Sequence, residues 1–193
     1  LALLTSGIQS ELREVVLRNK PTEFLATSPK GTVPVLVTTQ GEVIEQSWDI
    51  MLWALRQHDP ALWLPSDAKV FERGMQLLLS CDGEFKQPLD RYKYPQRHGL
   101  EDGTAARNEA MFFLANLESL LTQQRYLFDS NIGIFDAAIL PFVRQFAHVD
   151  IDWFAAQPLP SVQAWLSAFE NSTDFKRAMT VYPAWADNAP ITV

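Results

Sequence analysis

The stretch TVPVLVTTQGEVIEQSWDI occupies residues 32–50. Its β-branched and apolar residues at 33–37 predict a short strand, and Gln40-Gly41 is a tight-hairpin signal that leads to a second strand at 42–45. Ser47 is predicted to cap a helix whose apolar face includes Ile50. A hairpin followed directly by a helix predicts a small α/β unit.

The residues before this stretch continue the α/β pattern. Residues 1–6 read as the end of a helix that Gly7 stops, because glycine is the usual residue after a helix C-terminus. Residues 12–17 alternate polar and apolar side chains, which predicts a strand. A short helix is expected at 22–26, directly after Pro21. We therefore expect an α/β domain over residues 1–58.

The residues after this stretch are different in character. Residues 59–67 carry two prolines and predict a linker, and strand signals are missing from the pattern that follows. Apolar residues recur at helical spacing over 68–193, which predicts an all-helical domain. Residues 134–147 are apolar almost all round, as expected of a central helix that is buried on every side.

Composition excludes several classes of function. The 193 residues are 47% apolar and carry a formal net charge of −7, which argues against nucleic acid or an anionic membrane surface as partner. Since there is no run of about 18 apolar residues, no membrane span is expected. The single cysteine, Cys81, has no disulfide partner within the chain, which favours the reducing cytoplasm.

The histidines do not predict a metal site or a catalytic triad. His58, His98 and His148 stand alone, with no second ligand at helical or strand spacing, so we expect no bound metal.

Two local features point to a binding site. A cis Val33-Pro34 bond would turn the Val33 N–H and C=O towards solvent, where they could pair with a peptide-like ligand; an ordinary edge-strand proline is the alternative. Gln46 and Ser47 stand where a strand ends and a helix begins, a place suited to a ligand carboxylate, although plain helix capping also explains them. Together the two features would place a pairing edge beside an anion-binding helix end.

Four stretches resemble the glutathione S-transferase superfamily: LRNKP at 17–21, PKGTVPVL at 29–36, EQSWDI at 45–50 and GIFDAAILPFVRQF at 133–146. The first of them particularly resembles the omega and bacterial cysteine-type classes. The resemblance implies a thioredoxin-like N-terminal domain followed by an all-helical C-terminal domain, glutathione as the bound thiol, and a homodimer.

The resemblance also implies a role for each matched residue. The Val33 backbone would pair with the cysteinyl part of glutathione, Gln46 and Ser47 would hold its γ-glutamyl end, and Lys20 would face the glycyl carboxylate. Lys20 reads equally well as a solvated loop lysine. Pro34 and Asp136 would have structural roles.

Two departures from the family pattern bear on these expectations. The central helix has Gly133 where the family has Ser or Thr, so that only Asp136 can complete the capping box. The family carries its catalytic Cys, Ser or Tyr in an opening turn, and we expect that residue before Leu1, with the N-terminal domain truncated at its start. Cys81 is the alternative nucleophile, but a lone thiol beside an apolar stripe is more typical of a buried structural residue.

The function implied is glutathione-dependent transfer. Glutathione would attack a small-molecule electrophile or, with a catalytic cysteine, exchange with a mixed disulfide. The rival interpretation is a non-catalytic scaffold of the same fold that binds other proteins. The presence of Lys20, Val33, Gln46 and Ser47 together favours the enzyme, since a scaffold does not need a carboxylate-binding helix end beside a pairing edge.

Overall fold

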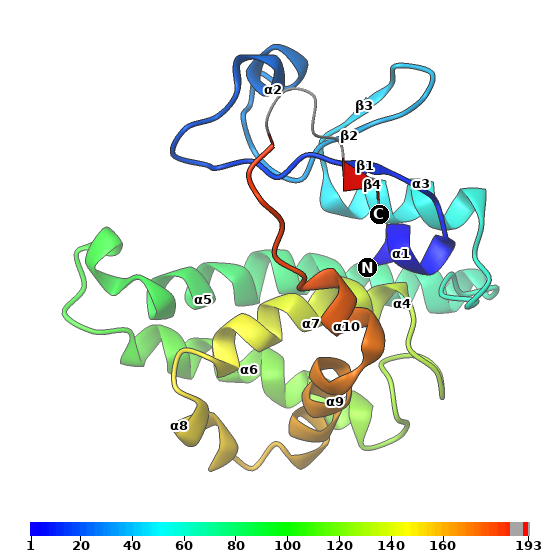
Figure 1. The fold of residues 1–193 in the computed structure, drawn as a ribbon. Coiled ribbons are helices and arrows are strands. Elements are labelled where there is room, and N and C mark those ends of the chain that lie inside the picture. The colour runs from blue at the N-terminus through cyan, green and yellow to red at the C-terminus, as the bar shows by residue number, and fades with distance from the viewer. Residues whose placement is uncertain (186–190, 193) are drawn as a thin grey trace. The chain divides into compact units, whose positions relative to one another are not determined.

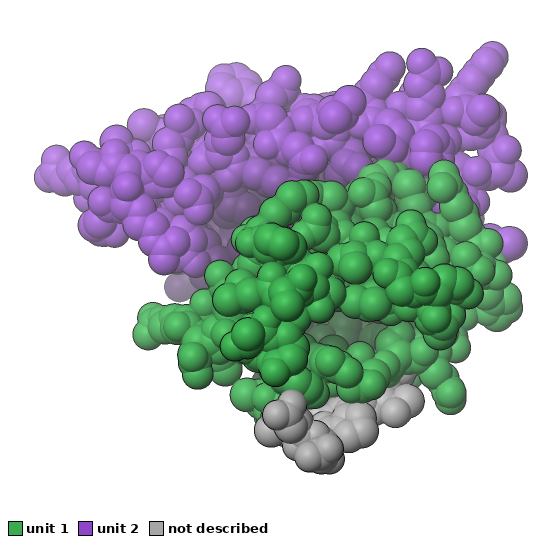
Figure 2. All heavy atoms as spheres, turned by 90° about the horizontal axis from the view of Figure 1, so that it is seen from above, with its two compact units in different colours: residues 1–61, 173–193 green, residues 62–172 purple. Residues whose placement is uncertain are grey.

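The computed structural model describes residues 1–185 and 191–192. The chain divides into two compact units, residues 1–61 with 173–193 and residues 62–172, which Figure 2 colours separately. The fold is mostly helical, with an α/β unit that contains the N-terminal residues and an all-helical second unit.

The first unit contains the small strands and the helix that follows the hairpin (Figure 1). Its elements are α1 (Ala2–Ser6), β1 (Glu11–Leu12), α2 (Thr22–Thr27), β2 (Leu36–Val37), β3 (Val43–Ile44), α3 (Ser47–Gln57), α10 (Thr173–Ala178) and β4 (Ile191–Thr192). β2 and β3 pair antiparallel, and Gly41 takes a φ of 83° in the turn that connects them. Gly7 ends α1 with a φ of 69°. The predicted hairpin, the helix after Pro21 and the glycine stop of α1 are confirmed.

The strands are shorter than the sequence predicts. The strand expected at 12–17 is limited to Glu11–Leu12, and the strand expected at 33–37 begins only at Leu36. Val16 and Leu17 are 49% and 57% exposed. The alternating pattern of residues 12–17 was therefore wrong as a strand signal, because a strand needs a hydrogen-bonded neighbour along its whole length.

The C-terminal segment was expected in the helical domain with residues 68–172, but it clusters with the N-terminal residues. Three sets of contacts explain this placement. α10 packs against α1, the Trp185 N–H donates to the Glu14 carbonyl oxygen at 2.8 Å, and β4 pairs antiparallel with β1. These are main-chain and packing contacts between residues far apart in the sequence, which periodicity does not reveal.

The second unit is a bundle of helices. It contains α4 (Ala68–Ser80), a π-helical turn (Cys81–Phe85), α5 (Lys86–Lys93), a 3-10 turn (Pro95–His98), α6 (Thr104–Leu121), α7 (Ile134–Ala147), α8 (Ile151–Ala155) and α9 (Pro160–Asn171). α7 has the predicted bounds and continues through Pro141. It contacts α4, α5 and α9, and nine of its fourteen residues are buried. The predicted central helix is therefore confirmed.

Asp136 anchors the start of α7 with three accepted hydrogen bonds. Its Oδ2 accepts from the Gly133 N–H at 3.0 Å, and its Oδ1 accepts from the Leu127 N–H at 3.0 Å and the Trp165 indole N–H at 2.8 Å. The carboxylate half of a capping box is thus present without the hydroxyl half, since Gly133 has no side chain. Burial raises the pKa of Asp136 to about 6, while the three donors act in the opposite direction.

A second carboxylate, that of Glu118 on α6, caps the start of α9. It accepts hydrogen bonds from the N–H groups of Ser161 at 3.0 Å and Val162 at 2.9 Å. Burial raises the pKa of Glu118, but these donors outweigh that effect and hold the pKa below its usual value. Because the ionised form makes the cap, its stabilisation is present above the ordinary glutamate pKa and is lost as the pH falls through the native pKa.

Glu118→Gln is expected to lower the free energy of unfolding by about 1 kcal/mol at pH 7, because an amide offers one acceptor oxygen to two N–H donors. Thermal melts of wild type and variant between pH 7 and pH 3 measure the difference, which should shrink towards the acid end. Glu101→Gln, at an exposed glutamate, is the control and should change neither the melting temperature nor its dependence on pH. A difference that stays constant over this range would contradict the assigned cap.

Candidate functional site

The start of α3 is the first part of the candidate site. Gln46 occupies the N-cap position with extended backbone angles, and Ser47 is the first helical residue. The expectation that Ser47 itself is the N-cap is therefore wrong by one position. The first hydrogen bond of the helix runs from the Ile50 N–H to the Gln46 carbonyl oxygen at 2.9 Å, and no side chain caps the helix in the described part of the chain. With both side chains exposed, this helix end is open to a ligand.

Val33 provides the second part. The Val33-Pro34 peptide bond is cis, which is the first of the two alternatives that the sequence left open. Val33 is 48% exposed, and within residues 1–185 and 191–192 its N–H and C=O make no hydrogen bond. Both groups are therefore available to pair with an extended peptide-like ligand.

Lys20 lies against the loop that leads to Val33. A Cβ atom placed on Gly31 would be 3.5 Å from the Lys20 Nζ and 3.6 Å from its Cδ, so the lysine side chain runs alongside that glycine. Gly31 itself has a φ of 61°, and its N–H donates to the Ser28 carbonyl oxygen at 2.9 Å. Lys20 is half-buried, with its ammonium group beside this turn.

Glu45 ties the same turn to the start of α3. The buried Ser28 hydroxyl donates to Glu45 Oε1 at 2.6 Å, and the Lys30 ammonium pairs with Oε2 at 3.1 Å. The Ser28 hydrogen bond, followed by Lys30, lowers the pKa of Glu45. Sequence reasoning missed both partners, which flank Pro29 in the sequence. The Glu45 carboxylate, which directly precedes the helix end, is thereby paired with the Lys30 ammonium.

The predicted residues are linked through these intermediaries. Lys20 meets the turn at Gly31, and the turn meets the helix start through Glu45. Among the described residues, no hydrogen bond or ion pair joins Lys20, Val33, Gln46 and Ser47 to each other. The site thus offers a cation, an unpaired backbone edge and an uncapped helix end from three connected segments.

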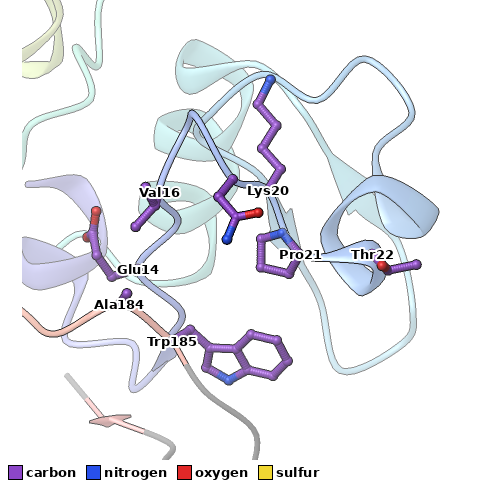
Figure 3. Close-up of a pocket in the computed structure, with 8 residues that line it drawn as sticks. Glu14, Val16, Lys20, Pro21, Thr22, Ala184 and Trp185 are labelled. Atoms are coloured by element: carbon purple, nitrogen blue, oxygen red, sulfur yellow. The ribbon is translucent and has the colours of Figure 1, made fainter.

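A cavity of about 340 Å³ adjoins Lys20 (Figure 3). Its lining consists of Glu14, Val16, Asn19, Lys20, Pro21, Thr22, Ala184 and Trp185. Figure 3 shows the Lys20 side chain extending away from the Trp185 indole, which lies near the Pro21 ring. Sequence analysis did not predict Trp185 here, because no local pattern connects a tryptophan near the C-terminus to a loop at residues 14–22.

Cys81 does not fit a catalytic role. It is fully buried in the π-helical turn, and burial raises its pKa to about 12, with Lys86 opposing this and Asp82 adding to it. The nucleophile in thiol chemistry is the thiolate, which is essentially absent at neutral pH when the pKa is this high. The interpretation of Cys81 as a structural thiol agrees with this environment.

The described residues include no helix that is both long enough and apolar enough to span a bilayer. They also include no group of three or more His, Cys, Asp or Glu side chains that could hold a metal ion.

Comparison with known proteins gives consistent matches. Residues 1–57 match the family model "Glutathione S-transferase, N-terminal domain". Glutathione S-transferase omega-1 of Sus scrofa is 24% identical over 170 residues, which cover 87% of this chain and 69% of that protein. Glutathione S-transferase GstB of Escherichia coli K12 is 26% identical over 156 residues, 76% of this chain and 73% of that protein.

Solved structures show the same fold. BphK, a bacterial glutathione S-transferase solved as a ternary complex, superposes with a TM-score of 0.76 at 22% identity, covering 92% of this chain and 90% of that one. Glutathione S-transferase 1-6 of Anopheles dirus species B gives a TM-score of 0.74 at 20% identity, covering 91% and 85%. The expected fold class, a thioredoxin-like domain with a helical C-terminal domain, is confirmed.

Proposed function

We propose that this chain binds glutathione and acts as a glutathione-dependent transferase, because residues 1–57 match the glutathione S-transferase N-terminal domain model and the chain has the glutathione S-transferase fold. In this proposal the glutathione thiol attacks a small electrophile or, with a cysteine nucleophile, exchanges with a mixed disulfide. The cosubstrate is glutathione, and no metal takes part. The group that activates the thiol is not assigned to any of residues 1–193.

The observation that carries this proposal is that one compact unit contains both an open helix end at Gln46 and Ser47 and an unpaired backbone edge at Val33. Glutathione is an extended tripeptide with a carboxylate at each end. The α3 N-terminus suits the γ-glutamyl carboxylate, the Val33 backbone suits the cysteinyl peptide groups, and the Lys20 ammonium suits the glycyl carboxylate. The same three requirements do not arise for a scaffold that binds only proteins.

The proposal extends to the form in which the protein works. We expect a homodimer, as the family resemblance implies, and a cytoplasmic location, which the single cysteine favours. Light scattering of the purified protein tests the oligomeric state. The domain boundaries predicted at 58 and 68 stay a prediction, testable by limited proteolysis, which should cut first within 59–67 if that segment is a linker.

Ser47→Ala is expected to weaken glutathione binding by about ten- to a hundredfold, because a hydrogen bond to a charged group contributes about 1.5–3 kcal/mol and a factor of ten corresponds to about 1.4 kcal/mol. Calorimetric titration of the full protein with glutathione measures the Kd. Thr104→Ala, which removes an exposed hydroxyl from the first residue of α6, is the matched control and should leave the Kd unchanged.

Two results would count against this function. If the wild-type protein releases no binding heat with glutathione, the proposed function is wrong and the scaffold interpretation gains. If it binds but Ser47→Ala has the wild-type Kd, the α3 helix end is not the glutathione site.

A further inference from the structure

The loop that carries Lys20 has little structure of its own. Residues 13–20, between β1 and α2, contain no helix and no strand, and most of them are exposed. The one backbone hydrogen bond recorded within this loop runs from the Asn19 N–H to the Val16 carbonyl oxygen at 2.9 Å. A loop with so few internal contacts needs outside support if its lysine is to hold a fixed position.

The C-terminal segment supplies contacts of three kinds to this loop and to the strand before it. The main-chain N–H of Trp185 donates to the Glu14 carbonyl oxygen at 2.8 Å. The Arg13 guanidinium lies over the Trp185 ring, 4.9 Å from its centroid, and also pairs with Glu11 at 2.9 Å. β4 pairs with β1 in the register Glu11 to Thr192 and Leu12 to Ile191. Trp185 is the residue at which a main-chain bond and a cation–π contact to the loop coincide.

Trp185 and Lys20 also border the same cavity (Figure 3). The indole forms one part of the lining, and the residues from Asn19 to Thr22 form another. Removing the indole would therefore enlarge the cavity next to the backbone of Lys20 and release the Arg13 contact. The Lys20 side chain itself runs along Gly31. A shift of the Lys20 backbone would therefore move its ammonium group relative to the turn at Gly31, which leads to Val33.

We propose that Trp185 is a positioning residue for the glycyl end of glutathione: it fixes the 13–20 loop and thereby places the Lys20 ammonium against the glycyl carboxylate. This inference rests on the proposed function. In this proposal the C-terminal segment contributes to glutathione recognition through Lys20, and the indole does not contact the ligand. The effect is specific to one end of the tripeptide, which makes it separable from a general loss of folding.

The test compares two ligands, glutathione and its glycyl ethyl ester, which lacks the glycyl carboxylate charge. Calorimetric titrations are made with the full wild-type protein, Trp185→Ala, Trp185→Phe and Lys20→Met. Trp185→Ala should weaken glutathione binding about fivefold, in line with a partly exposed cation–π contact, and Lys20→Met about tenfold or more. Both variants should bind the ester within twofold of wild type, and Trp185→Phe, which keeps a ring for Arg13, should stay within twofold for both ligands.

The matched control is Trp153→Ala. Trp153 also has an arginine over its ring, Arg107 at 4.1 Å, but it belongs to the helical unit. This variant should lower the melting temperature and leave both Kd values unchanged. If Trp185→Ala leaves the glutathione Kd unchanged, or weakens glutathione and ester equally, the positioning role is wrong while the proposed function stands. If wild type binds neither ligand, both the function and the positioning role are wrong.

Discussion

Asp136→Asn is expected to lower the free energy of unfolding by about 3 kcal/mol, which corresponds to a fall in Tm of roughly 6–12 °C for a chain of this size. The carboxylate accepts three N–H bonds on two oxygens in a position that is 2% exposed. Asparagine has one acceptor oxygen, so in either orientation its NH₂ group faces at least one of these donors. One or two buried N–H groups lose their partner, and a donor faces a donor.

An opposing effect is smaller. Neutral asparagine is easier to bury than a carboxylate, and burial is the reason that the pKa of Asp136 rises to about 6. Since this value remains below 7, the ionised form is still the main one in the folded protein at neutral pH. The missing acceptor therefore decides the sign.

Thermal and urea unfolding of the two proteins at pH 7 measure the effect, with Asp150→Asn as the matched control. Asp150 is the exposed N-cap of α8 and accepts one bond, from the Trp153 N–H at 3.0 Å. Asparagine caps a helix about as well as aspartate, so this control should change stability by only a few tenths of a kcal/mol. Equal Tm values for wild type and Asp136→Asn would contradict the role assigned to Asp136.

Gly74→Ala is the second large effect, an expected loss of about 3 kcal/mol. A methyl group on Gly74 in α4 would overlap the ring of Phe135 on α7. That ring is 2% exposed and lies between Phe71 and Phe128, with ring centroids at 5.6 Å on both sides. It has no free space into which to move, so the helices must separate or the side chains must leave their rotamers.

The control for this substitution is Gly83→Ala, one helical segment further on. A Cβ atom at Gly83 meets nothing within 4 Å, and the residue is exposed. Alanine is about 1 kcal/mol better than glycine in a helix, so Gly83→Ala should be neutral or stabilising in the same denaturation experiment. If Gly74→Ala were equally harmless, the close approach of α4 and α7 would not be as tight as the structure has it.

The helices of the fold could be predicted from local pattern. α7 has the bounds that its apolar residues indicate, and Pro21 and Gly7 mark a helix start and a helix end where they were expected. Strand lengths could not be predicted, because Val16 and Leu17 have strand-like neighbours in sequence but no pairing partner in space. The placement of residues 173–193 depended on contacts with residues 1–14, which no window of sequence contains.

The candidate site shows the same division. Sequence motifs identified Lys20, Val33, Gln46 and Ser47 as candidates, because each stands beside a turn residue or a helix start that can be recognised in the sequence. Ser28 could not be connected to Glu45, 17 residues later, without the fold. Trp185 is even further along the sequence from Glu14 and Arg13. Its contact with Arg13 produces no periodic pattern of residues from which it could be predicted.

Cys81 gives the helical unit a chemical reporter of its own. The thiol is the only one in the 193 residues, it is fully buried, and its pKa of about 12 suppresses the thiolate that alkylating reagents need. In the folded state such a reagent finds no reactive sulfur, whereas an opening of the helices around the π-helical turn exposes one. The rate at which a maleimide labels this chain therefore reports how often the native structure opens around Cys81. The measurement needs no engineered probe.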